Sequence, residues 1–312
     1  MNLSLHKNGG NDSLAVGFGP QRIEFALVRR GNGAKASVRA CACVAFEVSA
    51  LDALRELRKR LSAGRADCIA LLPADEYQLH VVDAPNVPDA EMRDAVRWRM
   101  KDMLDFPVEE ATVDVAQVPV DANAPARTRS LFAVSARNAQ IGECMKLFRE
   151  AHMRLRVIDV AEMAQRNIAS LFEDGPRAIA LLCFRDDHGL LTFSARGELC
   201  LTRRIDVGMD QIMQSAGDAR AQLFDRIALE LQRSLDHFDR QFGHLPLGRF
   251  LLGPLPEEVG LTDYLSRNLS MSAETLDLDS VLDFEHAPGL RAAAAQARVL
   301  HVLGAALRDE SP

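Results

Sequence analysis

Short runs of apolar residues, separated by residues that favour turns, mark the strands of this chain. Residues 13–47 contain three such runs with Gly-containing turns between them, and residues 178–207 repeat the layout. Each block predicts an antiparallel meander of three strands, and the repetition predicts a duplicated architecture. A further pair of runs, residues 68–72 and 77–82, predicts two strands that pair with each other across a turn at residues 73–76.

A different spacing, with apolar residues three and four positions apart, marks the helices. Over residues 89–104 it predicts an amphipathic helix that Asp89 can cap. Pro107 lacks a backbone N–H and cannot continue this helix, so a new strand is expected near Ala111. Residues 224–242 carry their apolar side chains on one face and predict a long helix packed on a core. We expect further strands at residues 131–135, 155–160, 249–252 and 274–278, and further helices at 139–153, 161–172, 261–269 and 290–308.

The composition allows two domain-sized cores and disfavours one class of partner. The chain has 312 residues, of which 48% are hydrophobic and 26% charged, so it can fold without disordered segments dominating. A net charge of −7 argues against a dedicated nucleic-acid binder. The run Arg55, Arg58, Lys59 and Arg60 leaves a local basic face open, but a solvated helix surface is the favoured interpretation.

Targeting signals and metal-binding patterns are weak in this sequence. No apolar run approaches the length of about 20 residues that a membrane span needs, and the N-terminal residues lack the apolar segment of a signal peptide. We therefore expect a cytoplasmic protein with reduced cysteines. Cys41 and Cys43 are close neighbours, but no further ligands follow at useful spacing, so no metal site is expected.

One motif resembles a known family. The Pro-rich residues before the helix, the pair Arg97 and Trp98 within it, and the Pro-Val-Glu-Glu sequence that starts at Pro107 resemble the PilM-like proteins of type IV pilus assembly, most closely those of MSHA-type systems. The resemblance spans nearly the whole chain. It implies an α/β, actin-like (ASKHA) two-lobed fold, with duplicated units of strand meander and helix and an inserted α+β subdomain. The first lobe would occupy residues 1–172, with the subdomain at about 50–150, and the second lobe residues 173–312.

The resemblance also implies two altered phosphate loops. In actin-like ATPases the first turn of each meander holds nucleotide phosphates on backbone N–H groups, and an aspartate before it organises magnesium. Here Gly17 stands at the first aspartate position, and Pro20 and Arg22 replace small residues of the loop. Cys183 stands at the second aspartate position and is followed by the bulky Arg185. Both loops are therefore expected to be degenerate, because phosphate needs a closely approaching backbone with free N–H groups.

The remaining nucleotide elements are weakened in the same way. The resemblance places Gly17, Gly19 and Gly253 around a degenerate nucleotide cleft, and we expect them to be structural turn glycines rather than ligands. No catalytic residue and no cofactor are expected, and binding of ATP with magnesium is a disfavoured alternative. Asp186 and Asp187 favour a solvated turn, with a displaced magnesium site as the alternative.

A partner surface follows from the resemblance as well. PilM-like proteins hold the cytoplasmic tail of a PilN-type inner-membrane protein in a groove between the inserted subdomain and the first lobe. By this resemblance Arg97 and Trp98 would anchor the tail, and Phe106 and Pro107 belong to the same motif. The alternative interpretation is that Trp98 packs against the subdomain sheet while Arg97 is solvated.

We therefore expect a non-catalytic cytoplasmic scaffold of MSHA-type pilus biogenesis. It would associate with the inner membrane through a PilN-like protein, without inserting into the membrane and without binding nucleic acid, and the assembly ATPase is a second candidate partner. One rival is a GspL-like component of type II secretion. GspL usually continues into a membrane helix, and the absence of one here favours the pilus interpretation. The other rival is an actin-like ATPase or phosphotransferase, which would need metal-organising carboxylates.

Overall fold

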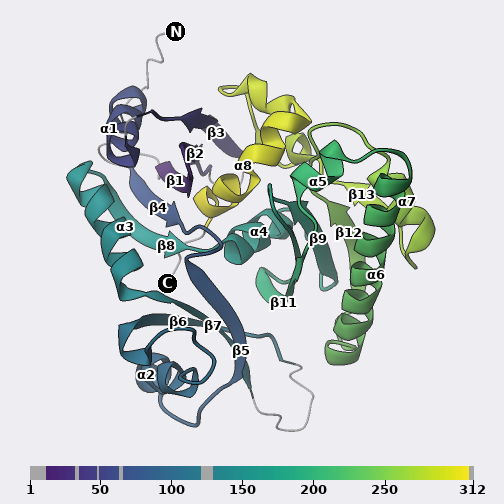
Figure 1. Ribbon diagram of the computed structural model, residues 1–312, viewed down its shortest axis with the longest axis horizontal. Helices are drawn as coiled ribbons and strands as arrows, with labels where there is room; N and C mark the ends of the chain where they lie inside the picture. The colour runs from purple at the N-terminus through teal and green to yellow at the C-terminus, as the bar shows by residue number, and fades with distance from the viewer. Residues whose placement is uncertain (1–11, 32–34, 48, 63–65, 121–128, 309–312) are drawn as a thin grey trace.

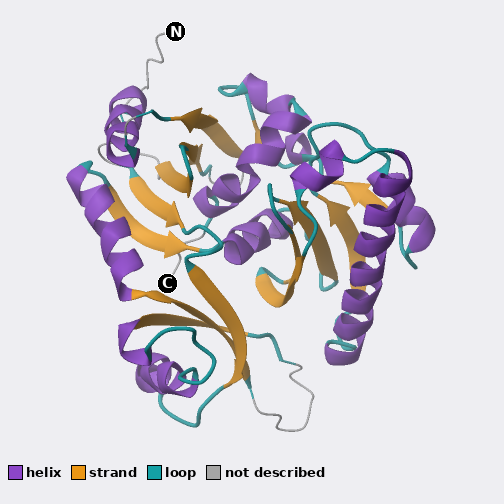
Figure 2. Ribbon diagram, viewed as in Figure 1, coloured by secondary structure: helices purple, strands orange, loops and turns teal. Residues whose placement is uncertain are grey.

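The computed structural model shows two α/β lobes and a smaller unit that extends from the first lobe (Figure 1). It describes residues 12–31, 35–47, 49–62, 66–120 and 129–308. Within these residues the strands form three sheets (Figure 2). The first-lobe sheet has the order β14-β3-β2-β1-β4-β8, with β1 Asp12–Gly19, β2 Arg22–Arg29, β3 Ala36–Ala45, β4 Asp67–Leu71, β8 Arg154–Asp159 and β14 Leu282–Asp283.

The other two sheets belong to the second lobe and to the smaller unit. The second-lobe sheet has the order β11-β10-β9-β12-β13, with β9 Ala178–Phe184, β10 Gly189–Ala195, β11 Glu198–Ile205, β12 Leu247–Leu252 and β13 Ala273–Thr275. The sheet of the smaller unit has the order β5-β7-β6, with β5 Tyr77–Asp83, β6 Ala111–Gln117 and β7 Ser130–Arg137. We call this unit the subdomain.

Helices cover the sheets and connect them. The α-helices are α1 Ala50–Leu61, α2 Asp89–Arg99, α3 Asn138–Glu150, α4 Ala161–Ser170, α5 Met209–Gln214, α6 Gly217–Gln241, α7 Leu261–Asn268 and α8 Ala293–Ala306. Short 3-10 helices are η1 Val108–Glu110, η2 Leu278–Ser280 and η3 Pro288–Arg291.

The predicted meanders and their duplication are confirmed. Strands β1, β2 and β3 pair antiparallel in sequence order, and β9, β10 and β11 do the same in the second lobe. In each lobe a parallel strand then joins the first strand of the meander, β4 beside β1 and β12 beside β9. The turn between the first two strands of each meander therefore occupies an equivalent place in each lobe.

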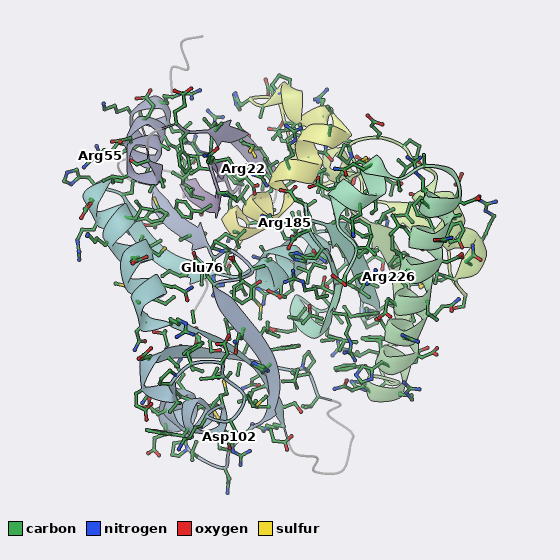
Figure 3. All side chains as sticks on the ribbon, viewed as in Figure 1. Arg22, Arg55, Glu76, Asp102, Arg185 and Arg226 are labelled. Atoms are coloured by element: carbon green, nitrogen blue, oxygen red, sulfur yellow. The ribbon has the colours of Figure 1, made fainter. Side chains whose placement is uncertain are left out.

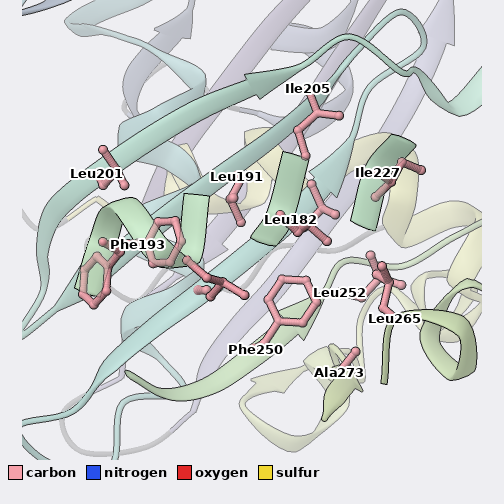
Figure 4. Packing of buried hydrophobic residues seen from close by; sticks show 14 of the residues in the cluster. Leu182, Leu191, Phe193, Leu201, Ile205, Ile227, Phe250, Leu252, Leu265 and Ala273 are labelled. Carbon is pink, nitrogen blue, oxygen red and sulfur yellow. The ribbon is translucent and has the colours of Figure 1, made fainter. Parts of the chain in front are cut away.

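The second lobe is held together by the predicted apolar face of residues 224–242. Phe224, Ile227 and Leu231 of α6 are buried against the sheet, in the cluster shown in Figure 4. Phe193 of β10 stacks on Phe238 of α6, with ring centroids 4.7 Å apart. Burial of such aromatic pairs contributes packing as well as apolar area, so this helix is fixed to the sheet along its length.

Helices α4 and α8 pack closely between the lobes. A Cβ on Gly304 of α8 would lie 2.1 Å from the Ala164 carbonyl oxygen of α4, so the two backbones touch there. Asn167 of α4 donates from Nδ2 to the Gly304 carbonyl at 2.9 Å. One core cluster contains residues of both lobes' sheets, such as Ala15 and Leu181, together with these helices. The lobes therefore share a core.

Three sequence predictions about local structure are wrong. Residues 68–72 and 77–82 do not pair, because β4 lies in the first-lobe sheet between β1 and β8, whereas β5 pairs with β7 of the subdomain. Helix α2 ends at Arg99 rather than at residue 104. Its N-cap is Pro88, not Asp89, and no side chain caps it. The spacing of apolar residues does not show which strands pair, because a short apolar strand can pair with any sheet edge that the tertiary fold places beside it.

The structure also departs from the expected lobe bounds. The C-terminal part of the chain returns to the first lobe, where β14 pairs in parallel with β3 and α8 packs against β1 and β2. The subdomain sheet extends only from β5 to β7, since α1, β4, α3 and β8 belong to the first lobe. The chain has therefore returned to the first lobe at β14, before α8 begins.

Candidate functional site

The turn between β1 and β2 has its small residues packed rather than open. Gly17 faces α8, where a Cβ would lie 3.1 Å from Val302 Cγ1. A Cβ on Gly19 would lie 3.0 Å from Arg22 Cγ, because the Arg22 side chain lies across the backbone of the turn. The glycines thus allow close packing at this turn, and the Arg22 side chain covers its backbone.

Ion pairs join this turn to the equivalent turn of the second lobe. Arg22 Nη2 donates to Asp186 Oδ2 of the β9–β10 turn, and Arg22 Nε lies 3.4 Å from Glu24 Oε1 of β2. Arg185 of the second lobe reaches back, with Nη1 3.5 Å from Glu24 Oε2. Arg22 and Arg185 are labelled in Figure 3. We call Arg22, Glu24, Arg185 and Asp186 the interlobe clasp.

Burial makes the clasp more than a surface feature. Glu24 is only 5% exposed, and both arginines neutralise its carboxylate. The hydrogen bond to Asp186 raises the pKa of Arg22. A buried carboxylate with its guanidinium partners is stable only while the partners stay in place. The clasp therefore links the first turn of one meander to the first turn of the other.

The remaining acid of the second turn is also paired. Asp187 accepts from His188 Nδ1 at 2.7 Å and from Arg204 Nη2 at 3.1 Å. Burial opposes ionisation of Asp187, but the bond from His188 and the charges nearby lower its pKa overall. Asp186 and Asp187 are exposed, as expected for a solvated turn, and each also carries an ion pair. Across the described part of the chain, no group of three potential His, Cys, Asp or Glu metal ligands occurs.

Gly253 is held against the second lobe's meander. Its N–H donates to the Leu182 carbonyl at 2.7 Å, and a Cβ would lie 2.7 Å from Cys183 Sγ. Cys183 is buried, and burial raises the pKa of its thiol far above the usual value, so it remains protonated. Beyond Gly253 lies a cavity of about 380 Å³, whose polar lining includes Thr262 and Asp277.

A buried polar network lies between the lobes and was missed from the sequence. Gln165 of α4 donates from Nε2 to the carbonyls of Leu181 and Leu190 at 2.7 and 3.0 Å. Its Oε1 accepts from His301 Nε2 of α8 at 3.1 Å. Burial, with the charge of Arg185 nearby, lowers the pKa of His301 well below its usual value, so the imidazole is neutral. The signal in the sequence was one polar residue within the apolar face of each helix, Gln165 in α4 and His301 in α8.

The four residues predicted to bind a partner lie on the subdomain in two pairs. Trp98 is 54% exposed, so the alternative that it packs against the sheet is wrong. The Arg97 guanidinium carbon lies 5.8 Å from the Trp98 ring centroid. Phe106 lies under the Arg137 guanidinium at 4.4 Å, and Pro107 is the N-cap residue of η1.

The subdomain also exposes other apolar side chains. Val81 of β5 is 50% exposed, Met103 after α2 is 43% exposed, and Val120 after β6 is 56% exposed. Val82, next to Val81, is buried with Val96 of α2 and Met100 just after it, so Val81 and α2 lie on opposite faces of the subdomain sheet. Sequence periodicity placed Met103 on the apolar face of a longer helix, but the end of α2 at Arg99 leaves it exposed.

A second cavity, of about 330 Å³, is lined by residues of both the subdomain and the second lobe. Tyr77 of β5 and Glu162 of α4 line one side, and Arg203 and Arg204 of β11 line the other. The Tyr77 hydroxyl donates to Glu162 Oε2 at 2.6 Å, and burial raises the pKa of Glu162. This bond fixes the first strand of the subdomain to the helix between the lobes.

Comparison with solved structures identifies the architecture. The chain superposes on a structure described as a PilM-PilN type IV pilus biogenesis complex with a TM-score of 0.74 and 19% identity, over 96% of this chain and 99% of that one. The fold is actin-like. A further match is the cytoplasmic domain of EpsL, an inner-membrane component of the type II secretion system of Vibrio cholerae, with a TM-score of 0.52 and 14% identity over 89% of this chain and 95% of that one.

A third, weaker match is a Bacteroides thetaiotaomicron protein of unknown function with an actin-like ATPase fold, at a TM-score of 0.48 and 10% identity over 88% of this chain and 93% of that one. No family profile matches the chain. No curated protein matches it either. Identities this low show a shared fold, in agreement with the two-lobed architecture expected from the sequence. Within the described residues, no helix combines the length and apolar character that a membrane span requires.

Proposed function

We propose that this protein is a non-catalytic scaffold of MSHA-type type IV pilus biogenesis, similar in role to MshI. In this role it lies in the cytoplasm beside the inner membrane and binds the cytoplasmic tail of a PilN-like inner-membrane protein. The assembly ATPase is its second candidate partner. The structural likeness to the PilM-PilN complex supports a component of this kind of machine.

The interlobe clasp is the observation that carries the non-catalytic part of the proposal. Phosphoryl transfer needs metal-organising carboxylates and backbone N–H groups aimed at phosphate. Here Gly17 and Cys183 supply no carboxylate, and the cations Arg22 and Arg185 are engaged by Glu24 and Asp186. A nucleotide would have to displace ion pairs that already join the lobes.

The exposed apolar side chains of the subdomain support the partner-binding part. Trp98 offers a large aromatic surface, and the Arg97 guanidinium lies beside it. Aromatic and arginine side chains together are the residues that most often dominate binding energy at interfaces. We assign the tail to the subdomain surface that carries Arg97, Trp98, Phe106 and Pro107.

A second candidate, a component of type II secretion, rests on the likeness to the EpsL cytoplasmic domain. It uses the same fold and no nucleotide chemistry. The two candidates differ in the partner, so binding experiments separate them.

The test is a titration of the purified chain with synthetic peptides. One peptide carries the cytoplasmic tail of a PilN-like inner-membrane protein, and another carries the same residues in scrambled order. We expect binding of the first peptide alone, weakened at least tenfold by Trp98→Ala or Arg97→Glu. Leu229→Ala removes an equally exposed apolar side chain, 46% exposed on α6, and is the matched control. Equal binding of both peptides, or no effect of the subdomain variants, would contradict the proposal.

A further inference from the structure

One end of the first lobe carries a concentration of cations that neither the clasp nor the partner surface uses. Helix α1 finishes there and leads into β4, and α3 finishes there and leads into β8. Because β4 and β8 are parallel neighbours, with Asp67 opposite Arg154, both helices end at the same edge of the sheet. We call the following residues the basic end: Arg58, Lys59, Arg60, Lys146, Arg149, Arg154 and Arg156.

The core fixes these cations relative to one another. Leu57 and Leu61 of α1 and Phe148 of α3 are buried in one cluster under the two helices. Figure 1 shows α1 and α3 at the outer side of the first lobe, away from the second lobe. Arg55, one turn earlier on α1, is labelled at this outer side in Figure 3. The cations of α1 and α3 therefore lie on neighbouring helices at this outer side, and Arg154 and Arg156 lie with Asp67 at the start of β8.

Carboxylates do not balance this surface. Asp67 is the carboxylate nearest the start of β8, and it is shared by Arg154 at 2.7 Å and Arg156 at 3.3 Å. Lys146 approaches Glu150 at 3.9 Å with both side chains largely exposed, a weak interaction. The chain as a whole has a net charge of −7, so a positive surface of this size runs against its average. Helix ends attract some cations, but that effect concerns the last turn of each helix and not strand β8.

An exposed apolar side chain lies among the cations. Met145 of α3 is 53% exposed and is followed by Lys146 and, one turn on, by Arg149. Cations that surround an apolar side chain on a helix face are typical of surfaces that rest on anionic lipid, where the charges meet headgroups and the apolar group enters the interface. A site that binds single-stranded nucleic acid would instead present an aromatic side chain for stacking.

We propose that the basic end rests on the surface of an anionic lipid bilayer. This contact involves no insertion of a segment and is separate from capture of a partner tail, because the exposed apolar side chains of the subdomain lie on other elements. It orients the first lobe toward the membrane with α1 and α3 at the surface. The contact depends on charge, so it weakens as salt screens the headgroups.

The experiment is co-sedimentation of the purified full chain with vesicles. One set contains equal parts of phosphatidylglycerol and phosphatidylcholine, and the other contains phosphatidylcholine alone. The test variant combines Lys59→Glu, Lys146→Glu and Arg149→Glu. The matched control combines Arg226→Glu, Arg233→Glu and Arg240→Glu, which reverse the same number of exposed charges on α6 of the second lobe. Circular dichroism and melting curves establish that each variant is folded.

We expect binding to the anionic vesicles only, and its loss at about 1 M salt, where the screening length is roughly 3 Å. Each basic side chain near an anionic surface contributes roughly fivefold, so loss of three weakens binding about a hundredfold. The test variant reverses these charges and should bind at least that much more weakly, while the control binds like the parent. Three outcomes would each overturn the proposal: equal binding to neutral vesicles, an equal loss in the α6 control, or binding to duplex DNA but not to anionic vesicles. None of these three outcomes depends on whether the chain binds a pilus partner.

Discussion

Arg22 of the first lobe donates a hydrogen bond to Asp186 of the second, and this ion pair joins the first turns of the two meanders. The two residues are 164 positions apart in the sequence. Their contact joins equivalent turns, the β1–β2 turn of the first lobe and the β9–β10 turn of the second. The ion pair is therefore a direct link between the lobes.

The clasp predicts an unequal effect of two variants on stability. Asp186→Ala removes an exposed partner and should lower the free energy of unfolding by less than about 1 kcal/mol. Removing both arginines, as Arg22→Ala with Arg185→Ala, leaves the buried Glu24 carboxylate without a cation and should cost about 3 kcal/mol. Urea denaturation at neutral pH measures both values. Equal effects of the two variants would show that Glu24 does not depend on the arginines.

The altered loops predict that nucleotide does not stabilise the folded chain. A ligand at a hundredfold excess over its dissociation constant adds about 2.7 kcal/mol to the stability of the state that binds it. We expect no change of melting temperature with millimolar ATP and magnesium. A rise with ATP that is absent with magnesium alone would contradict the non-catalytic proposal and would favour the ATPase alternative.

His301 predicts a loss of stability in weak acid. Its folded-state pKa lies well below the unfolded value of about 6.5, so below that pH the unfolded chain binds a proton that the folded chain does not. Stability should therefore fall as the pH drops below about 6.5, by up to about 1.4 kcal/mol per pH unit from this residue. His301→Gln removes the titrating group, and its stability should depend less steeply on pH between 6.5 and 5. Urea denaturation at several pH values compares the slopes, and parallel slopes would rule out His301 as the source.

Replacement of glycine by alanine should have opposite effects on stability at Gly304, which lies at the contact of α8 with α4, and at Gly142, which lies in open space on α3. Gly304→Ala places a Cβ against the Ala164 carbonyl oxygen and should destabilise the chain by about 1 to 3 kcal/mol, or more if the helices cannot separate. Gly142→Ala in α3 meets no atom within 4 Å and should stabilise by about 0.5 to 1 kcal/mol, because alanine favours helix. Thermal melts of both variants measure the difference. A neutral Gly304→Ala would mean that the helix pair shifts freely.

Trp98 predicts a spectroscopic signal for partner binding. The chain has one tryptophan, and its side chain is 54% exposed, so its fluorescence reports this surface alone. A tail that covers the ring removes it from water and should shift the emission to shorter wavelength. Titration with the tail peptide measures the shift, and the scrambled peptide is the control. Tight binding with unchanged emission would place the tail elsewhere on the molecule.

The pattern of apolar residues was enough to predict the strands of both meanders, helix α6 and the repeat. The alternation of apolar residues predicted β1 to β3 and β9 to β11, and the three- and four-residue spacing predicted α6, because these patterns follow directly from the geometry of strands and helices. The assignment of Gly17 and Cys183 to the aspartate positions came from the resemblance to the PilM-like pattern and not from the spacing of residues in this chain. The exposure of Trp98 could not be predicted, because the burial of a boundary residue depends on what packs beside it.

Which strands pair and which helices pack together follows from the three-dimensional fold. The pairing of β4 with β1 rather than β5, and the return of β14 and α8 to the first lobe, depend on contacts between distant segments that local spacing does not encode. The same holds for Arg22 with Asp186 and for Gln165 with His301. A polar or charged residue in the sequence predicts solvent exposure, and its burial becomes favourable only when the fold supplies a partner of matching charge or hydrogen-bonding capacity.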